Sequence, residues 1–303
     1  MKVASGQNTL SKLSVSPIEE GGLTGSRGMI GKLDRAALQV ISHSGMTIRE
    51  GIRAVGGDPD RLDLARRQPG ELLAFIELHI EQGSILHEEK VDIGVVEGIV
   101  GIRWWDVTIK GVANHAGTTP MNRRQDAIVT AAELALAINR VATTELDRQV
   151  ATVGRIKAEP GAPNVIPGKV VMSLEIRDLN ADKIQHVFDL IEKEAIRIAD
   201  SRHTPIRFNE IAVELPPAPT NERMRLITLA SADKLGLSFK LMPSGAGHDA
   251  QDMTHIAPTG MIFVPSANGI SHAPDEYTPP LDMANGVNVL LQTVLAIDNG
   301  ALE

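Results

Sequence analysis

The chain has 303 residues, of which 43% are hydrophobic and 22% charged, values typical of a folded globular protein rather than a disordered one. It carries 30 Lys+Arg against 38 Asp+Glu, a net charge of −8, and only 3% aromatic residues, which argues against a nucleic-acid or anionic-membrane partner. It contains no cysteine, so disulfides, thiolate nucleophiles and thiolate-ligated zinc are excluded. Histidines and carboxylates are what is left for a metal or proton-transfer site.

The sequence gives no sign of membrane insertion or secretion. It has no run of about 18 consecutive apolar residues, the length that a membrane-spanning helix needs. The opening residues 1–16 lack the apolar centre of a signal peptide, so we expect a cytoplasmic protein.

The first part of the chain predicts a loop, a helix and a strand. Residues 1–28 are rich in Ser and Gly without a clear period, which is typical of a loop. Thr47 and Glu50 form a capping-box pair at the start of a predicted helix that ends at the Gly56-Gly57 pair. Residues 75–81 alternate apolar and polar side chains with the period of a strand, and a short helix is expected to follow them.

The middle third predicts a ferredoxin-like domain. Its expected elements alternate in the order β-α-β-β-α-β, the split βαβ pattern. The strands are predicted at 102–110, 149–158, 170–177 and 204–213, and the helices at 122–142 and 181–200.

The last part again alternates helices and strands after a Pro-rich linker at 214–221. The fold class is therefore α/β, with a layered domain made of residues 1–97 and 214–303 and a smaller domain inserted at 98–213. The expected elements after the linker are a helix at 221–235, strands at 238–242 and 261–266, and a helix from about 281.

Four of the nine histidines stand in loops or strand ends beside carboxylates or small residues. Imidazole next to carboxylate in such places suits the inner and outer shells of a metal site. The alternative is that these loops are ordinary capped turns, since Ser-Gly-Ala-Gly-His-Asp and Ser-His-Ala-Pro-Asp also make good N-caps. The four are His79, His115, His248 and His272.

Four further polar residues are candidates for a site, and the glutamate pair and Arg177 have two explanations each. The adjacent Glu19 and Glu20 are either solvated surface or a pair in which one binds a cation and the other activates water. Arg177 lies on the polar face of a predicted strand, where it either grips a substrate carboxylate or forms a surface ion pair. Asn164 lies in the turn APNVIPG of the same inserted domain.

Six motifs, taken in their order along the chain, resemble those of one known family. ELHIEQG, GVANHAGTTPMNRRQDA, PGAPNVIPG, LEIRD, PSGAGHDAQDM and GISHAPDEYT are similar to the allantoate amidohydrolase / N-carbamoyl-L-amino-acid hydrolase (hydantoinase/carbamoylase) family, which also includes ureidopropionase-type enzymes. This family belongs to the binuclear-metal aminoacylase and carboxypeptidase superfamily. The resemblance runs from about Thr47 to the C-terminus and implies a catalytic α/β domain with an inserted lid and dimerisation domain.

The resemblance also implies roles for individual residues in the hydrolysis of a ureido or amidine C–N bond that releases ammonia. It implies that Arg177 binds the substrate carboxylate, and that His115 reaches into the partner subunit's site and polarises the scissile carbonyl, so that a homodimer is the active unit. The other implied roles are metal ligation by His79, His272 and Glu20, general-base catalysis by Glu19, and substrate binding by Gln82, Asn164, Gly247 and His248.

The sequence departs from the family at its start. Family members carry a further histidine ligand and a bridging aspartate ahead of the glutamate pair, and residues 1–18 contain neither residue type. Because a bridging carboxylate screens the repulsion between two cations, we expect at most one weakly held divalent ion, zinc or manganese, instead of the two per subunit that the family implies. The alternatives are an impaired, N-terminally shortened amidohydrolase and a non-catalytic remnant that dimerises and binds a small ureido or carbamoyl acid. An aminoacylase or dipeptidase fits the motifs less well.

Overall fold

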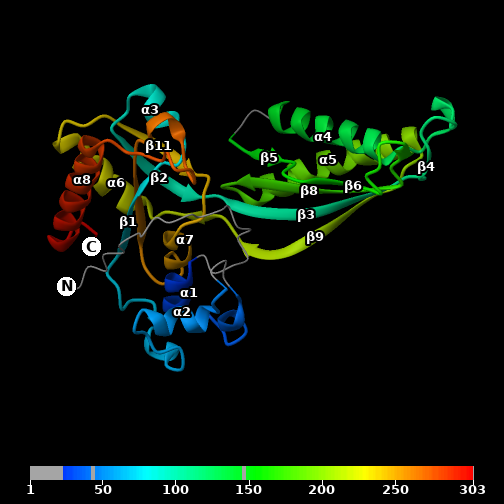
Figure 1. Cartoon of the computed structure of the whole chain (residues 1–303). Helices are drawn as coiled ribbons and strands as arrows, with labels where there is room; N and C mark the ends of the chain where they lie inside the picture. Colours follow the sequence, from blue (N-terminus) through cyan, green and yellow to red (C-terminus); the bar gives the residue numbers. More distant parts are fainter. Residues whose placement is uncertain (1–22, 42–44, 145–147, 303) are drawn as a thin grey trace. The chain divides into compact units, whose positions relative to one another are not determined.

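The computed structural model describes residues 23–41, 45–144 and 148–302, and the chain divides into two compact units (Figure 1). Unit 1 comprises residues 1–97 and 219–303, and unit 2 comprises residues 98–218. The sequence placed the end of the inserted domain at residue 213. The division falls later because strand β9 (Ile206–Leu215) stays paired with unit 2 as far as Leu215, opposite Ile102.

Unit 1 is built on a five-stranded mixed sheet. Its strands run in the order β1-β12-β2-β10, and β11 also pairs with β2. The strands β1 and β12 are parallel and in register from Phe75 opposite Thr259 to Ile80 opposite Val264, so their carboxyl ends lie side by side. The bounds are β1 (Phe75–Ile80), β2 (Ile93–Ile99), β10 (Ala218–Pro219), β11 (Phe239–Ser244) and β12 (Thr259–Val264).

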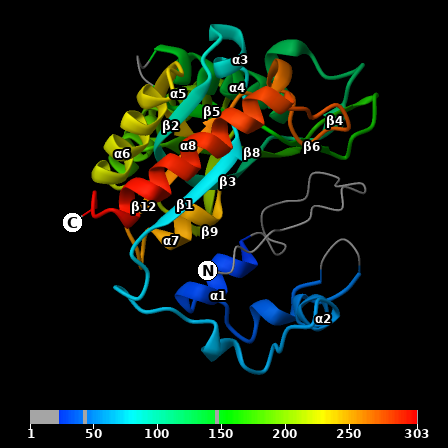
Figure 2. The ribbon, with the colours of Figure 1, turned by 90° about the vertical axis from the view of Figure 1, so that its left-hand side faces the viewer.

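Helices α6 (Glu222–Lys234) and α8 (Pro280–Asp298) cover one face of this sheet and lie side by side (Figure 2). The buried cluster between them and the strands includes Ile262, Val264 and Val289, with Ile76, Leu78 and Ile80 packed against it. Helix α7 (Asp249–Met253) contacts β1 and β12 as well. Because strand side chains alternate between faces, Glu77 and His79 point to the face opposite this cluster, where α7 lies.

The smaller elements of unit 1 agree with the sequence except at its start. Thr47 and Glu50 form both hydrogen bonds of the predicted capping box at helix α2 (Ile48–Ala54), and α3 (Ile85–Glu89) follows β1. The prediction of a loop through residue 28 was wrong for residues 24–28, which belong to helix α1 (Thr24–Ile30). This Gly-containing helix is stabilised by tertiary contact, since the buried Ser26 hydroxyl donates to Asp252 of α7.

Unit 2 has the ferredoxin-like arrangement that the sequence predicts. Its antiparallel sheet has the order β5-β8-β3-β9, with β6 also paired with β8, and helices α4 and α5 lie on the same side of it (Figure 1). The bounds are β3 (Gly101–Lys110), α4 (Ala127–Thr144), β5 (Val150–Thr152), β6 (Ile156–Glu159), β8 (Lys169–Asp178) and α5 (Ala181–Arg202). A separate two-stranded sheet joins β4 (Asn114–His115) to β7 (Val165–Ile166).

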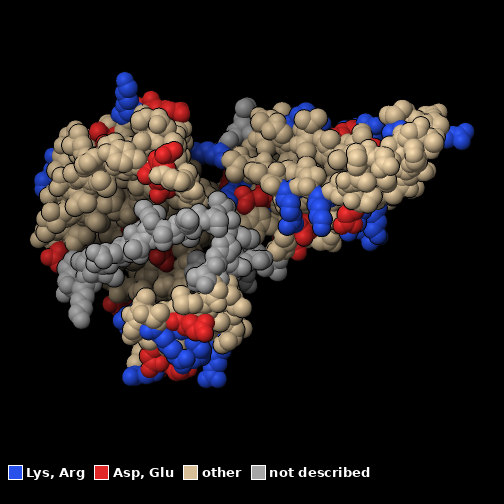
Figure 3. All heavy atoms as spheres, in the orientation of Figure 1, with Lys and Arg blue, Asp and Glu red and all other residues tan. Residues whose placement is uncertain are grey.

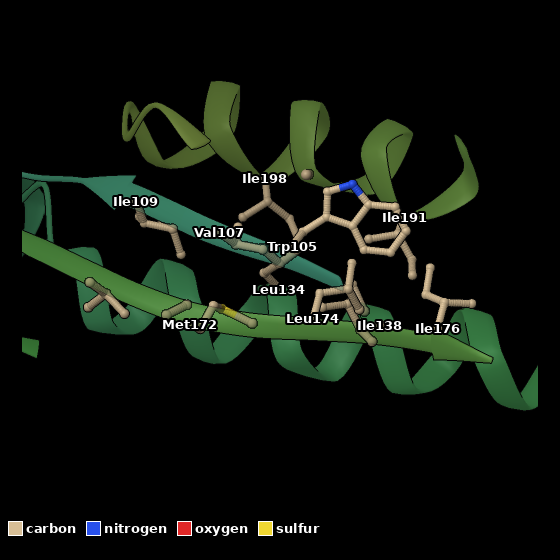
Figure 4. Packing of buried hydrophobic residues seen from close by; sticks show 14 of the residues in the cluster. Trp105, Val107, Ile109, Leu134, Ile138, Met172, Leu174, Ile176, Ile191 and Ile198 are labelled. Carbon is tan, nitrogen blue, oxygen red and sulfur yellow. The ribbon is translucent and has the colours of Figure 1, made fainter. Parts of the chain in front are cut away.

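The core of unit 2 fills the space between this sheet and its two helices (Figure 4). Trp105 stacks on Phe188 with ring centroids 4.5 Å apart, and the Arg103 guanidinium lies over Trp105. Helix α4 is long and apolar enough to cross a membrane, but its inner face, including Leu134 and Ile138, is buried in this cluster. It is therefore the core helix of a folded unit.

Two predicted elements of unit 2 differ in detail. The strand expected at 149–158 is divided into β5 and β6, which both pair with β8. Between the pairs Thr152–Glu175 and Ile156–Met172 the chain advances by four residues on one strand and by three on β8. The extra residue forms a bulge. Helix α4 begins at Ala127 rather than at residue 122, since Asp126 accepts the N–H of Ile128 as a cap.

Ion pairs are spread over the surface of unit 2. On the face shown in Figure 3, basic and acidic side chains lie next to each other along this unit. Ion pairs within it include Arg103 with Glu210 and Arg202 with Glu133. Pairs of this exposed kind contribute about 0–1 kcal/mol each, so the buried cluster is what stabilises the unit.

We expect two helical glycines to respond oppositely to alanine. A Cβ at Gly286 of α8 would lie 2.4 Å from Val264 Cγ1 and 2.8 Å from Leu78 Cδ1, whereas a Cβ at Gly51 of α2 would meet nothing within 4 Å. Gly286→Ala should therefore lower the free energy of unfolding by about 1–3 kcal/mol. Gly51→Ala should raise it by about 0.5–1 kcal/mol. Urea unfolding of both variants measures this, and a Gly286→Ala variant as stable as the parent would contradict the close packing of α8 on the sheet.

Candidate metal centre

Strand β1 carries two polar side chains that could bind a metal. Its residues 76, 78 and 80 pack into the apolar cluster, so Glu77 and His79 share the other face. The same face of β12 presents Phe263, whose partner in register is His79. The site thus begins with two donors held two residues apart on a hydrogen-bonded strand.

His79 is prepared to bind a cation. Its Nδ1 lies 2.8 Å from the carbonyl oxygen of Ile80, which can only accept, so Nδ1 carries a proton and Nε2 has the free lone pair when the ring is neutral. Burial lowers the pKa of His79 below 6.5, and the nearby His248 adds to this, although the Ile80 carbonyl, Glu77 and Glu276 act in the opposite direction. A ring that donates one N–H to a carbonyl and stays neutral is the usual form of a histidine ligand.

His248 comes from the Gly-rich loop between β11 and α7. It is buried, and its ring packs edge-on against His79 with centroids 4.6 Å apart. Its Nε2 lies 2.8 Å from Ser244 Oγ and its Nδ1 lies 3.5 Å from Glu77 Oε1. Ser244, His248 and Glu77 therefore stand in the order of a nucleophile, a base and an acid, but Ser244 is fully buried and cannot reach a substrate.

Glu77 joins the two histidines to helix α7. Its Oε2 accepts the backbone N–H of Ala250, in the first turn of that helix, at 2.8 Å. Burial by itself raises the pKa of Glu77, but the hydrogen bond and charge of His248, with the Ala250 N–H, outweigh it and hold the pKa below 4.5. The carboxylate is therefore ionised at neutral pH and has negative charge to offer a cation.

Glu77, His79 and His248 together can hold a metal ion. One donor atom from each lies within 4.8 Å of the others, and this is the group of that kind found among the described residues. Two imidazole nitrogens and a carboxylate oxygen suit zinc and the other first-row divalent ions. The set fits a divalent ion. His79 Nε2 has no hydrogen bond to the described residues, and His248 can bind on release of Ser244 or Glu77.

A second polar cluster lies just beyond the carboxyl ends of β1 and β12. Gln82 Nε2 lies 3.2 Å from His272 Nε2 and 3.2 Å from Ser271 Oγ, and Glu276 accepts from the Ser271 hydroxyl and the His272 N–H. Gln82 and His272 both have positive φ, 59° and 55°. Such strained conformations in non-glycine residues are concentrated at functional sites.

The two clusters of unit 1 adjoin. His79 and Gln82 are three residues apart where β1 ends, and the Gln82 N–H donates to Ser266 just after β12. Glu276, which holds the His272 loop, also acts on the pKa of His79. His79 and His272 are therefore brought to the same edge of the sheet. Gly247, next to His248, lies exposed in the neighbouring loop.

The sequence-predicted residues of unit 2 fall into two groups. His115 and Asn164 lie together, since the Ala116 N–H donates to the Asn164 carbonyl and His115 pairs with Val165. Arg177 lies near the far end of β8, where its guanidinium makes two hydrogen bonds with Glu175, of 2.7 and 2.9 Å. Strand β7, which pairs with His115, ends three positions before Lys169 begins β8. Arg177 is eight positions further along β8, about 26 Å at 3.3 Å per residue.

Some predicted residues lie outside what the structure describes, and some site residues were not predicted. Glu19 and Glu20 fall within residues 1–22, outside the described part of the chain. The sequence assigned no role to Ser244, nor to Glu77 and Glu276, which it showed only as carboxylates close to His79 and His272. Glu77 was accessible in principle, because the alternation along β1 places it beside His79. Ser244 and Glu276 each lie four residues from the histidine that they contact, and these contacts depend on how their own loops turn back.

Comparisons with known proteins agree with these motifs. The family model described as Peptidase family M20/M25/M40 matches residues 5–296. The N-carbamoyl-L-amino acid amidohydrolase of Geobacillus stearothermophilus is 38% identical over 279 residues, which cover 92% of this chain and 68% of the relative. The allantoate amidohydrolase of Escherichia coli K12 is 35% identical over 246 residues, which cover 81% of this chain and 59% of the relative.

A solved structure gives the same result. The crystal structure of an amidase of the hydantoinase/carbamoylase family from Burkholderia multivorans superposes with a TM-score of 0.82 at 32% identity, covering 92% of this chain and 68% of that one. The chain thus spans roughly three fifths to two thirds of the length of these relatives. The resemblance indicated by the six motifs is confirmed, and the chain belongs to peptidase family M20/M25/M40.

Proposed function

We propose that this chain is a metal-dependent amidohydrolase that cleaves the linear C–N bond of a ureido or amidine acid, such as allantoate or an N-carbamoyl amino acid. The observation that carries the proposal is the grouping of the neutral His79 with Glu77 and His248, in a chain whose relatives are named as amidohydrolases. For a carbamoyl substrate, R–NH–CO–NH2 and one water give R–NH2, ammonia and carbon dioxide.

The metal in this proposal is one divalent ion, zinc or manganese, per chain. His79 is a ligand, Glu77 and His248 lie within reach of the same ion, and His272 is the ligand of the adjoining cluster. Bound there, the ion would act as a Lewis acid on the scissile carbonyl and activate water. Glu20 as a further ligand and Glu19 as the general base complete the proposal from the family resemblance.

The family resemblance supplies the substrate-binding residues of this proposal. Gln82 supplies an amide beside His272, and Gly247 and His248 form the neighbouring loop. Arg177, which Glu175 holds by two hydrogen bonds, binds the substrate carboxylate through its planar guanidinium. His115 and Asn164 bind the carbonyl end.

We propose further that the active unit is a homodimer. If His115 and Arg177 both touch one small acid, they cannot come from the same copy of unit 2, because about 26 Å of strand β8 separates their ends of the sheet. A second copy must then supply one of them. The lid and dimerisation role of unit 2 is part of this proposal.

Metal content and activity test the proposal directly. The chain, dialysed and then supplied with manganese or zinc, should release ammonia from allantoate, an N-carbamoyl amino acid or ureidopropionate. It should retain at most one metal equivalent after dialysis, and His79→Ala should weaken metal binding by at least about 10- to 100-fold. His186→Ala, an exposed histidine of α5, is the control and should change neither measurement. Intact dimers that release no ammonia from any substrate would support a non-catalytic binding protein, and two tightly held equivalents would refute the single ion.

Mixing two inactive variants tests the shared site. His115→Ala and Arg177→Ala homodimers should each be inactive, whereas co-expressed heterodimers contain one site with both side chains intact. A random mixture should recover about a quarter of the parent activity. Mixing His115→Ala with Asn164→Ala should recover less activity. These two residues lie at the same end of unit 2, so one copy supplies both to a site. No recovery in the first mixture would argue that one copy supplies both residues.

The neutral state of His79 predicts a pH dependence of stability. Because its pKa in the folded chain lies below 6.5, the unfolded chain binds more protons between the two values, and stability is fully present above pH 6.5 and falls as the pH drops below it. Measured in a chelator, the free energy of unfolding should rise with pH in this window by up to about 1.4 kcal/mol per unit. His79→Gln should flatten this slope and His186→Gln should not. Glu77, whose pKa is also lowered, contributes with the same sign only below pH 4.5.

A further inference from the structure

The loop that carries His115 fixes the position of the proton on its ring. The ring nitrogen Nδ1 accepts the backbone N–H groups of Gly117, at 3.0 Å, and Thr118, at 3.2 Å. A nitrogen that accepts two hydrogen bonds carries no proton, so the neutral ring holds its proton on Nε2. The side chain is exposed, and among residues 23–41, 45–144 and 148–302 nothing bonds to Nε2.

A single arginine holds this loop in shape. Arg124 Nη2 donates to the carbonyl of Ala116 at 2.6 Å, and its Nε donates to the carbonyl of Thr119 at 3.0 Å. The planar guanidinium thereby fixes both sides of the turn with two directed bonds, which a lysine cannot reproduce. The Ala116 N–H is held in turn by the Asn164 carbonyl, and the Thr119 hydroxyl donates to the His115 carbonyl.

The turn also leaves little room for a side chain at Gly117 beneath the His115 ring. A Cβ at Gly117 would lie 3.2 Å from His115 Cε1 and 3.5 Å from its Nδ1. A side chain there would push the ring away from the two N–H groups. Glycine at this position therefore allows the ring to lie directly on the turn.

We propose that Arg124 is a positioning residue for His115. By binding the Ala116 and Thr119 carbonyls, it keeps the Gly117 and Thr118 N–H groups on Nδ1 and presents Nε2–H as a hydrogen-bond donor. In this state the neutral ring has no free lone pair, so it serves neither as a base nor as a metal ligand. It donates to an acceptor oxygen, which under the proposed function is the carbonyl of the ureido or carbamoyl group, where negative charge develops during hydrolysis.

Nitrogen NMR of the histidine ring tests the proton position without any assay of activity. In uniformly ¹⁵N-labelled protein at pH 8, with the signals assigned by His115→Gln, we expect an unprotonated Nδ1 and a protonated Nε2 in the parent. Arg124→Met should give averaged ¹⁵N shifts of two tautomers. The control is Arg123→Met, since Arg123 is exposed and its side chain forms no hydrogen bond or ion pair with the described residues. It should leave the parent pattern unchanged.

Kinetics give the second readout. Arg124→Met should lower kcat by about 10²-fold, as misplacement of a catalytic group by about an ångström does, with a smaller change in KM. Arg124→Lys should recover only part of the loss, and Arg123→Met should keep the parent rate. If Arg124→Met does not fold, Gly117→Ala displaces the same ring and should give the same tautomer mixture.

Two results would overturn the proposal. One is a parent protein whose His115 is protonated at Nδ1. The other is a folded Arg124→Met or Gly117→Ala variant that keeps the parent tautomer. The proposed function can fail separately: a parent that hydrolyses none of the substrates still gives the NMR result, which then decides the role of Arg124 alone.

Discussion

The two-residue period of strand β1 is the constraint on which the candidate metal centre depends. Apolar residues at 76, 78 and 80 must face the cluster under α6 and α8, and this forces Glu77 and His79 onto the opposite face. Parallel pairing with β12 over the whole length of β1 fixes the height of both donors. A shift of register by one residue would exchange the two faces and place the donors in the apolar core.

The loops that follow the strands complete the site. Because β1 and β12 are parallel, Gln82 and the loop of His272 leave the sheet at the same edge, where the amide and the ring meet. Both residues have positive φ, which the hydrogen bonds from Ser271 and His272 to Glu276 and from the Gln82 N–H to Ser266 help to maintain. Ligands of open α/β sheets commonly bind beyond the carboxyl ends of strands, and the polar side chains of unit 1 gather at such an edge.

Unit 2 orients its proposed substrate-binding side chains in a different way. Its sheet and two helices form a well-packed frame, and the chemistry is placed on a loop and on a strand end. His115 is oriented by backbone N–H groups and by Arg124 rather than by a carboxylate, which makes it a donor. Arg177 is oriented by Glu175, whose carboxylate also accepts the indole N–H of Trp104. Each proposed substrate contact thus has a partner within its own unit that fixes its direction.

Much of the architecture followed from local pattern. The alternation of apolar and polar residues predicted β1 and β8, and the apolar stripe at helical spacing predicted α5. The Thr47–Glu50 pair predicted the start of α2, and the order of elements predicted the ferredoxin-like unit. These features depend on neighbours a few residues apart, so periodicity and capping chemistry are sufficient to predict them. Helix α1 was missed because its Gly-rich sequence has weak helical propensity and its stability comes from α7.

The sequence by itself determined the two units, the family motifs and the face of β1 on which His79 lies. Only the tertiary structure decided what His79 meets there. The approach of His248, with Ser244 and Glu77 on its two nitrogens, depends on how the β11–α7 loop closes over the sheet. The bonds of Arg124 across the His115 turn are likewise set by loop geometry. Local periodicity assigns a residue to a face, but pairing between distant segments is fixed by register and packing, which no short stretch of sequence contains.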